Sequence, residues 1–157
     1  MRRARPAWIA ILLAASCLPS CRRRQEEPRV RIAGGLWRVE LAVDQSVREK
    51  GLAGRDEVAD GTGMLFVFGR EEVHSFHMLN CRVPLDVAFI SARLHVVEIR
   101  TMPVEADPSN PKNHYSSRRP ARYALEVAAG ALARAGVQIG DRVELLGRAK
   151  HATKEAR

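Results

Sequence analysis

The sequence predicts a mainly β protein, at the margin of the α+β class, folded as a compact antiparallel sandwich or barrel. Short segments of alternating or apolar residues recur along the chain, and turns rich in Gly, Pro and polar residues separate them. This spacing is typical of all-β domains. Only two short segments carry helical signals. We therefore expect about seven strands and two short helices around a single core.

The first strand is expected within residues 30–44. From residue 36 to residue 43 one face is apolar and the other is largely polar, which is the pattern of a half-buried strand. Gly34 and Gly35 mark a hairpin turn just before the alternating part.

A short helix is expected next. Ser46 and Glu49 have the spacing of a capping box, in which each side chain bonds the backbone N–H of the other residue. The helix should end near Gly51 or Gly54, because glycine readily adopts the positive φ that closes a helix. Residues 55–63 are polar and contain glycine, so they are expected to form a loop.

The middle of the chain contains four strand-like segments, over residues 64–68, 73–80, 85–91 and 94–101. Residues 103–120 follow with four prolines and no periodicity. A loop of this length inside a compact domain is uncommon, and it is usually functional or disordered.

The C-terminal part predicts a strand over residues 121–127, a short helix over residues 129–135 and a last strand over residues 142–146. Residues 148–157 are expected to form a basic, flexible tail. The domain boundaries then follow. A single β-rich domain spans residues 30–147, and a tether over residues 21–29 precedes it.

Residues 1–20 have the pattern of an exported bacterial protein. Three arginines within residues 2–5 precede the apolar residues 7–15, a stretch too short for a spanning helix, which needs roughly 20 apolar residues. Residues 18–21 resemble a lipobox, which predicts cleavage before Cys21 and acylation of that cysteine. Cleavage at Cys17, plain secretion and an uncleaved anchor are the alternatives.

These features predict location and partners. The chain from residue 21 onward has 137 residues, with 23 basic and 18 acidic side chains, a net charge of +5. Its basic residues do not form a stripe interleaved with aromatic residues, so we expect no nucleic-acid partner. We expect a monomer in the cell envelope, held to the membrane by its N-terminal lipid. Arg22 rather than Asp follows the cysteine, which favours the outer membrane, facing the periplasm, in a cell with two membranes.

Five sequence blocks identify a resemblance to a known family. In order along the chain they are Gly51-Leu52, Gly63-Met64-Leu65-Phe66-Val67-Phe68, Pro84-Leu85-Asp86-Val87-Ala88-Phe89-Ile90, Tyr123-Ala124-Leu125-Glu126-Val127 and Gly136-Val137-Gln138-Ile139-Gly140-Asp141-Arg142-Val143. They resemble the DUF192 family, also called UPF0127, over about residues 36–147. The resemblance implies a compact β-rich unit in a group of small, often exported proteins of uncharacterised function.

The chain departs from the family pattern at one place. The family usually has Phe-Trp-Met-Lys-Asn-Thr before its Pro-Leu-Asp block, whereas this chain has Phe76-His77-Met78-Leu79-Asn80-Cys81. His77 and Asn80 are therefore candidate ligand-binding residues, and the binding could differ from that of relatives.

Two carboxylates are candidates for chemistry. Asp86 and Glu126 each lie in an apolar strand segment, where a carboxylate must be hydrogen-bonded, paired or protonated. Asp86 has a structural interpretation, tying down a turn, and a functional one. If both residues faced one cavity, their like charges would raise one pKa. The sequence does not establish that they do.

Cys81 is the one cysteine left for the domain once Cys17 is removed and Cys21 is acylated. We expect a small buried apolar residue, with a reactive thiol or an intermolecular bridge as alternatives. His77 shares a strand face with Cys81, but four residues span roughly 13 Å along a strand. We therefore expect no metal site and no cofactor.

The long loop supplies further candidates, Tyr115 and Arg118, for a polar or anionic ligand. Two functions stay open. The first is a membrane-tethered, non-catalytic binding or accessory domain of the cell envelope, with an unknown small-molecule or envelope ligand. The alternative is an envelope hydrolase that uses Asp86 and Glu126 as its carboxylates.

Overall fold

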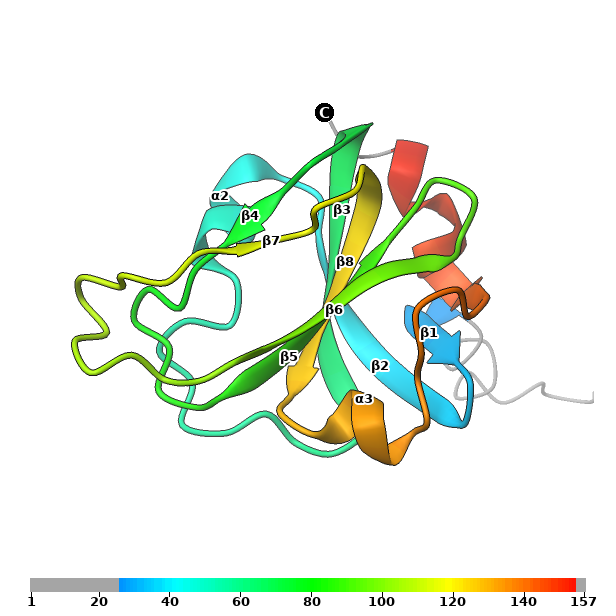
Figure 1. Cartoon of the computed structure of the whole chain (residues 1–157). Helices are drawn as coiled ribbons and strands as arrows, with labels where there is room; N and C mark the ends of the chain where they lie inside the picture. The colour runs from blue at the N-terminus through cyan, green and yellow to red at the C-terminus, as the bar shows by residue number, and fades with distance from the viewer. Residues whose placement is uncertain (1–25, 155–157) are drawn as a thin grey trace, which may run out of the picture.

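A computed structural model describes residues 26–154 of the chain, and its main feature is one seven-stranded sheet in the order β6-β5-β8-β3-β2-β1-β9 (Figure 1). The sheet strands are β1 (Arg29–Ile32), β2 (Gly35–Ala42), β3 (Thr62–Glu72), β5 (Leu85–Ile90), β6 (Val96–Met102), β8 (Ala121–Ala128) and β9 (Val143–Leu146). The sheet curls into a half-barrel. A bridge between His95 and Arg142 links the starts of its two edge strands. The expected mainly β fold is confirmed.

One pair of neighbours in this sheet is parallel. β2 and β3 run in the same direction, and the helix α2 (Gln45–Lys50) lies in the connection between them. Parallel neighbours need such a crossover, because a tight turn can only reverse the chain. The crossover puts α2 against one face of the sheet, where it forms a wall of the cavity described below.

Each face of the sheet has its own core. Because side chains alternate along a strand, Leu65, Leu125 and Ile90 lie on one face of the sheet. Phe66 and Phe89 lie on the other face. The first face is closed by α3 (Ala131–Arg134) and the 3-10 helix η1 (Gly147–Lys154), whose apolar residues are buried in the same core. The second face is covered by α2 and by the small ribbon of β4 (Ser75–Phe76) and β7 (Tyr115–Ser116).

The helix α2 was predicted, but its capping box is wrong. Its N-cap is Asp44, without a side-chain cap hydrogen bond. Glu49 instead accepts a hydrogen bond from the Gln45 side chain at 2.8 Å. The helix closes at Gly51, as expected, where φ is +50° and the backbone N–H donates to the Val47 carbonyl.

The expected strand over residues 73–80 is wrong in length, since only residues 75 and 76 are extended and paired, as β4. Their partner is β7, inside the segment expected to be a loop over residues 103–120. Ser117 helps to fix β7 beside β4, because its buried side chain accepts a hydrogen bond from the His74 N–H at 3.1 Å. The long segment is thus attached to the domain at its C-terminal end.

The expected flexible tail is also different in the structure. Within the described part of the tail, η1 buries Ala149 and Ala152 completely against the first core. Their small side chains allow the helix to approach the sheet closely. The expected signal peptide and the lipidation site Cys21 lie outside the described residues. Between residues 26 and 154, no helix is long and apolar enough to cross a membrane.

Candidate functional site

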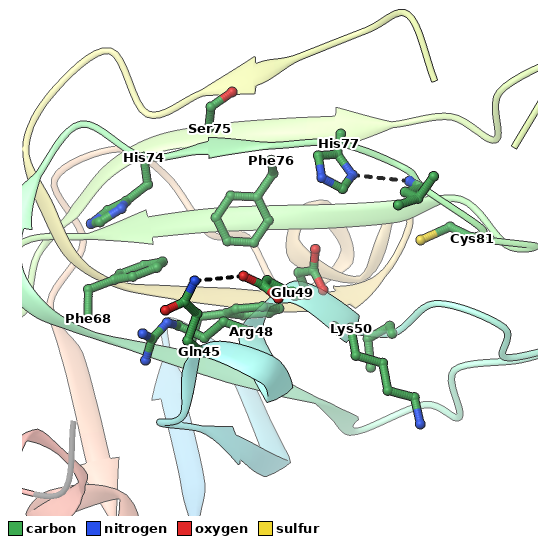
Figure 2. Close-up of a pocket in the computed structure, with 15 residues that line it drawn as sticks. Gln45, Arg48, Glu49, Lys50, Phe68, His74, Ser75, Phe76, His77 and Cys81 are labelled. Carbon is green, nitrogen blue, oxygen red and sulfur yellow. Dashed lines mark hydrogen bonds between the residues drawn. The ribbon is translucent and has the colours of Figure 1, made fainter. Parts of the chain in front are cut away.

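A cavity of about 230 Å³ lies between the sheet and the elements that cover its second face (Figure 2). Phe66 of β3 and Glu126 of β8 form its floor on the sheet side, and Arg48 of α2 and Phe76 of β4 line it from the covering side. Binding sites of small ligands are typically apolar clefts with a few placed polar groups. This cavity is smaller and more polar than most such sites, since several charged and polar side chains line it beside three phenylalanines.

Glu126 is the most unusual residue of the cavity. Its neighbours across the strands are Met64 and Val87, and only 4% of its surface is exposed. Burial raises the pKa of its carboxyl to about 8, and the nearby charge of Arg55 offsets this rise in part. Among the described residues, no hydrogen-bond donor reaches the carboxyl.

Gly51 opens the cavity toward this carboxyl. A Cβ atom placed at Gly51 would lie 3.4 Å from Phe66 Cζ and 3.6 Å from Glu126 Oε2. Any larger side chain at this position would extend toward the carboxyl and fill the space in front of it. The residue that ends α2 therefore also leaves access to Glu126.

Three phenylalanine rings, Phe66, Phe68 and Phe76, form the apolar part of the wall. Phe76 meets Phe66 edge to face, with ring centroids 4.9 Å apart, and it meets Phe89 in the same way at 5.3 Å. Phe68 and His74 are stacked at 3.5 Å. Burial lowers the pKa of His74, although the Ala121 carbonyl, 3.1 Å from its Nε2, raises it in part. This end of the cavity is thus apolar and closely packed.

Cys81 lines the opposite end of the cavity and is a free, buried cysteine. Desolvation raises the pKa of its thiol to about 11, and the charge of Glu126 adds to the rise. A thiol with this pKa is protonated at neutral pH and is a weak nucleophile. The expectation of a small buried side chain agrees with this placement.

His77, predicted from its departure from the family pattern, is exposed and lines the cavity. Its Nδ1 accepts a hydrogen bond from the Leu79 N–H at 3.3 Å, as drawn in Figure 2. His114 lies across from it, with ring centroids 6.4 Å apart. Within residues 26–154, no group of three or more His, Cys, Asp or Glu side chains is arranged to hold a metal ion.

The structure does not bring Asp86 and Glu126 together. Asp86 on β5 is paired with Val127, the neighbour of Glu126 on β8, so the two carboxyl groups point to opposite faces of the sheet. Asp86 accepts hydrogen bonds from the Thr101 hydroxyl at 2.8 Å and from the Leu132 N–H at 3.3 Å. It therefore has the structural role considered above, and a carboxylate pair sharing one cavity is wrong.

The other predicted residues lie outside the cavity wall. Asn80 has a φ of +54°; its N–H donates to the Pro108 carbonyl at 2.7 Å, and its carbonyl accepts from the Gly54 N–H at 2.8 Å. Tyr115 is half-buried beside the second core. Arg118 is exposed at a turn. Asn80 and Tyr115 thus support the covering segments rather than line the cavity.

Three further residues line the cavity that were not predicted from the sequence: Arg48, Gly51 and His74. Arg48 donates to the Val43 carbonyl and, at 3.2 Å, to the Val67 carbonyl, and it lies over the Phe68 ring at 5.9 Å. Gly51 was available as a signal, because it belongs to the first block of the family pattern. Nothing in the sequence marked Arg48 or His74. The contacts of Arg48 depend on the crossover, and those of His74 depend on the return of the chain at Ser117 and Ala121.

The fold and the cavity define a small β half-barrel protein with one face arranged around a buried carboxyl. Sequence comparison gives its family: the chain belongs to DUF192, described as "Uncharacterized ACR", which matches residues 29–145. The resemblance noted from the sequence is confirmed. Among proteins with curated descriptions, none is similar to this chain.

Two solved structures show the same fold. A protein of Sinorhizobium meliloti 1021, described as a candidate transcription regulator, is 37% identical; the match covers 76% of this chain and 93% of that one, with a TM-score of 0.69. A protein of unknown function from Novosphingobium aromaticivorans DSM 12444 is 31% identical, over 74% of this chain and 83% of that one, with a TM-score of 0.66.

Proposed function

We propose that this protein is a non-catalytic binding domain of the bacterial cell envelope, tethered to the membrane by a lipid on Cys21. The domain binds a small molecule in the cavity at Glu126. The observation that carries the proposal is the buried carboxyl without a hydrogen bond from the described residues. Buried polar groups in proteins are almost always paired, so an unpaired one that faces a cavity suits a ligand.

The chemistry of the cavity favours binding over catalysis. The Cys81 thiol has a pKa of about 11, so it is protonated at neutral pH. The Nδ1 of His77 already accepts a backbone hydrogen bond, and the two carboxylates of the hydrolase alternative lie on opposite faces of the sheet. That alternative would need a new acid–base partner for Glu126.

The description of the Sinorhizobium relative suggests a role with nucleic acid, and the charge of this domain argues against transferring it. Residues 26–154 contain 19 basic and 17 acidic side chains. Affinity for nucleic acid depends on several cations placed along the phosphates. The near balance of charge in this domain therefore favours a small-molecule ligand.

The binding part of the proposal is tested by a ligand-detected NMR screen of the full-length chain with neutral and charged small molecules. Gly51→Leu fills the space in front of Glu126, and we expect it to abolish binding. Gly54→Leu is the matched control. Gly54 also has a positive φ, +76°, but an added Cβ there meets nothing within 4 Å. Equal binding by both variants would place the ligand elsewhere and contradict the proposal.

The tethering part is tested in cells. Wild type should incorporate a labelled fatty acid and sediment with membranes, whereas Cys21→Ser should be unlabelled and leave the membrane fraction. In a cell with two membranes, we expect wild type in the outer one, facing the periplasm, as a monomer. An unlabelled wild type with an intact N-terminus would contradict lipidation without bearing on the cavity.

A further inference from the structure

Glu126 has no compensating charge of its own. The cation whose charge acts on it is Arg55, and that guanidinium is already bonded through two nitrogens to the Glu40 carboxylate, at 2.7 Å each. An ionised carboxylate in an apolar site is costly unless it is paired and hydrogen-bonded. In its ionised form, Glu126 therefore lacks both a hydrogen-bond donor and a neighbouring positive charge.

The surroundings of Gly51 are also those of a cation site. The position that a Cβ would take there lies 3.6 Å from Glu126 Oε2, 3.8 Å from the Arg48 carbonyl oxygen and 3.4 Å from Phe66 Cζ. A carboxylate oxygen, a carbonyl oxygen and an aromatic ring thus converge on the space beside the Gly51 Cα. Two oxygen acceptors attract an N–H donor, and the edge of the Phe66 ring offers an apolar contact to the carbon part of a ligand.

We propose that the cavity binds the ammonium group of a small primary amine, with the nitrogen beside the Glu126 carboxyl at Gly51 and the organic part against Phe66 and Phe76. This inference deepens the proposed function and rests on it. An ammonium has three donors and no acceptor, which matches two facing oxygens. The volume of about 230 Å³ limits the ligand to a small molecule.

The cations around the cavity leave this position free. The Arg48 guanidinium is held by the Val43 and Val67 carbonyls over the Phe68 ring, and Figure 2 shows the Lys50 side chain directed away from the cavity. The remaining titratable groups around the cavity are Glu49, His74, His77 and Cys81.

Proton balance gives the inference a signature of its own. Below pH 8 the Glu126 carboxyl is protonated, because burial raises its pKa to about 8. An ammonium that binds there releases this proton to the solvent and leaves a carboxylate paired with the cation. Apparent affinity should therefore rise about tenfold from pH 7 to pH 9. A neutral hydrogen-bond acceptor would show the opposite trend, because it needs the protonated carboxyl.

The test compares n-pentylamine with 1-pentanol by calorimetry on the full-length chain at pH 7 and pH 9. We expect the amine to bind at least tenfold more tightly than the alcohol, with proton release at pH 7 that is seen as a dependence on buffer ionisation enthalpy. Glu126→Gln should weaken amine binding at least tenfold. Glu49→Gln, which removes a carboxylate from the rim, should change it less than twofold.

Three results would overturn the inference alone: alcohol binding as tight as amine binding, amine affinity that falls from pH 7 to pH 9, or a larger loss in Glu49→Gln than in Glu126→Gln. The proton release of the wild type decides the question even if a variant folds poorly. Binding of neither probe overturns the inference; if the screen with Gly51→Leu also finds no ligand, the proposed function fails with it.

Discussion

Glu126 combines two properties that rarely occur together, a central position in a sheet and a carboxyl group without a hydrogen bond from the described residues. A residue of this kind lowers the stability of the fold, because the folded state must keep the carboxyl neutral or bury a charge. A leucine at the same position would pack between the apolar neighbours of both adjacent strands. The acid is therefore better explained by binding than by folding.

The same residue predicts how stability depends on pH. The folded carboxyl has a pKa of about 8, against an ordinary value of 4.5, so between these two pH values the folded state holds a proton that the unfolded state has lost. Stability contributed by this proton is complete below about pH 4.5 and decreases through pH 8, at up to about 1.4 kcal/mol per pH unit. Urea unfolding at pH 5, 7 and 9 measures this slope.

Glu126→Gln removes the titrating group, so the slope over this range should become markedly shallower. The variant should also be more stable than wild type at pH 9, where wild type buries a charge. Glu144→Gln, at an exposed position on β9, is the matched control and should keep the wild-type slope. Because the lowered pKa of His74 makes stability rise with pH over part of this range, the difference between wild type and Glu126→Gln isolates the effect of Glu126. A difference that stays constant from pH 5 to pH 8 would contradict the pKa shift of Glu126.

The sequence could not predict that Glu126 and Asp86 point to opposite faces of the sheet. Both are acids in apolar strand segments, and local pattern describes them in the same terms. Their faces depend on the register between β5 and β8, which pairs Asp86 with Val127. A shift of one residue would have put both carboxyls on one face, so only the three-dimensional pairing separates the structural acid from the buried one in the cavity.

Asp86 links the neighbouring strand β6 and the helix α3 through its carboxylate. One carboxylate oxygen accepts from Thr101 on β6, and the other accepts from the Leu132 N–H in α3. The helix α3 has four residues, too few to be stable without tertiary contacts. Its position over the first core thus depends on this carboxylate and on the buried side chain of Leu132.

Asp86→Ala should therefore lower the free energy of unfolding by about 1–3 kcal/mol, because two donors lose their acceptor in a largely buried site. Chemical denaturation with hydrogen exchange of the Leu132 amide measures the loss and locates it at α3. Thr101→Val, which removes only the hydroxyl donor, should cost less. Ligand binding at Glu126 should survive in both variants, since the cavity lies on the other face.

Elements were predictable where the local pattern was strong and unpredictable where tertiary contacts decide. The end of α2 followed from Gly51, and the strands β5, β6 and β8 followed from apolar runs. The capping box at Ser46 failed because Asp44 is the actual N-cap. The pairing of β4 with β7 joins segments about forty residues apart, and no local pattern indicates it.

The whole molecule is organised by one sheet with a different core on each face. The first face is closed by packing of α3 and η1, and the second encloses a cavity under α2 and the β4–β7 ribbon. The first face is thus filled by packed side chains, whereas the second face contains the cavity that a ligand could enter. The sequence indicated the β-rich class. It could not predict that the two faces differ, because this difference depends on the curl of the sheet and on the crossover between β2 and β3.

The basic composition of residues 148–157 predicted a flexible tail, whereas η1 packs against the first core. Removal of residues 148–157 uncovers the core that Ala149 and Ala152 close, so it should lower the free energy of unfolding by about 2 kcal/mol. Thermal and urea unfolding of the truncated chain measure this loss. Lys150→Ala is the control, because it changes only an exposed charge of η1. A truncated chain as stable as wild type would show that the segment is dispensable.

The pairing of β1 with β9 makes the earliest strand of the sheet depend on the latest one. During synthesis, Arg29–Ile32 must wait for Val143–Leu146 to emerge before its outer row of backbone groups is satisfied. Contacts this distant in sequence slow folding. A nascent chain therefore stays incompletely folded until residues 143–146 have left the ribosome, which would leave time for the export that the proposed lipid tether requires.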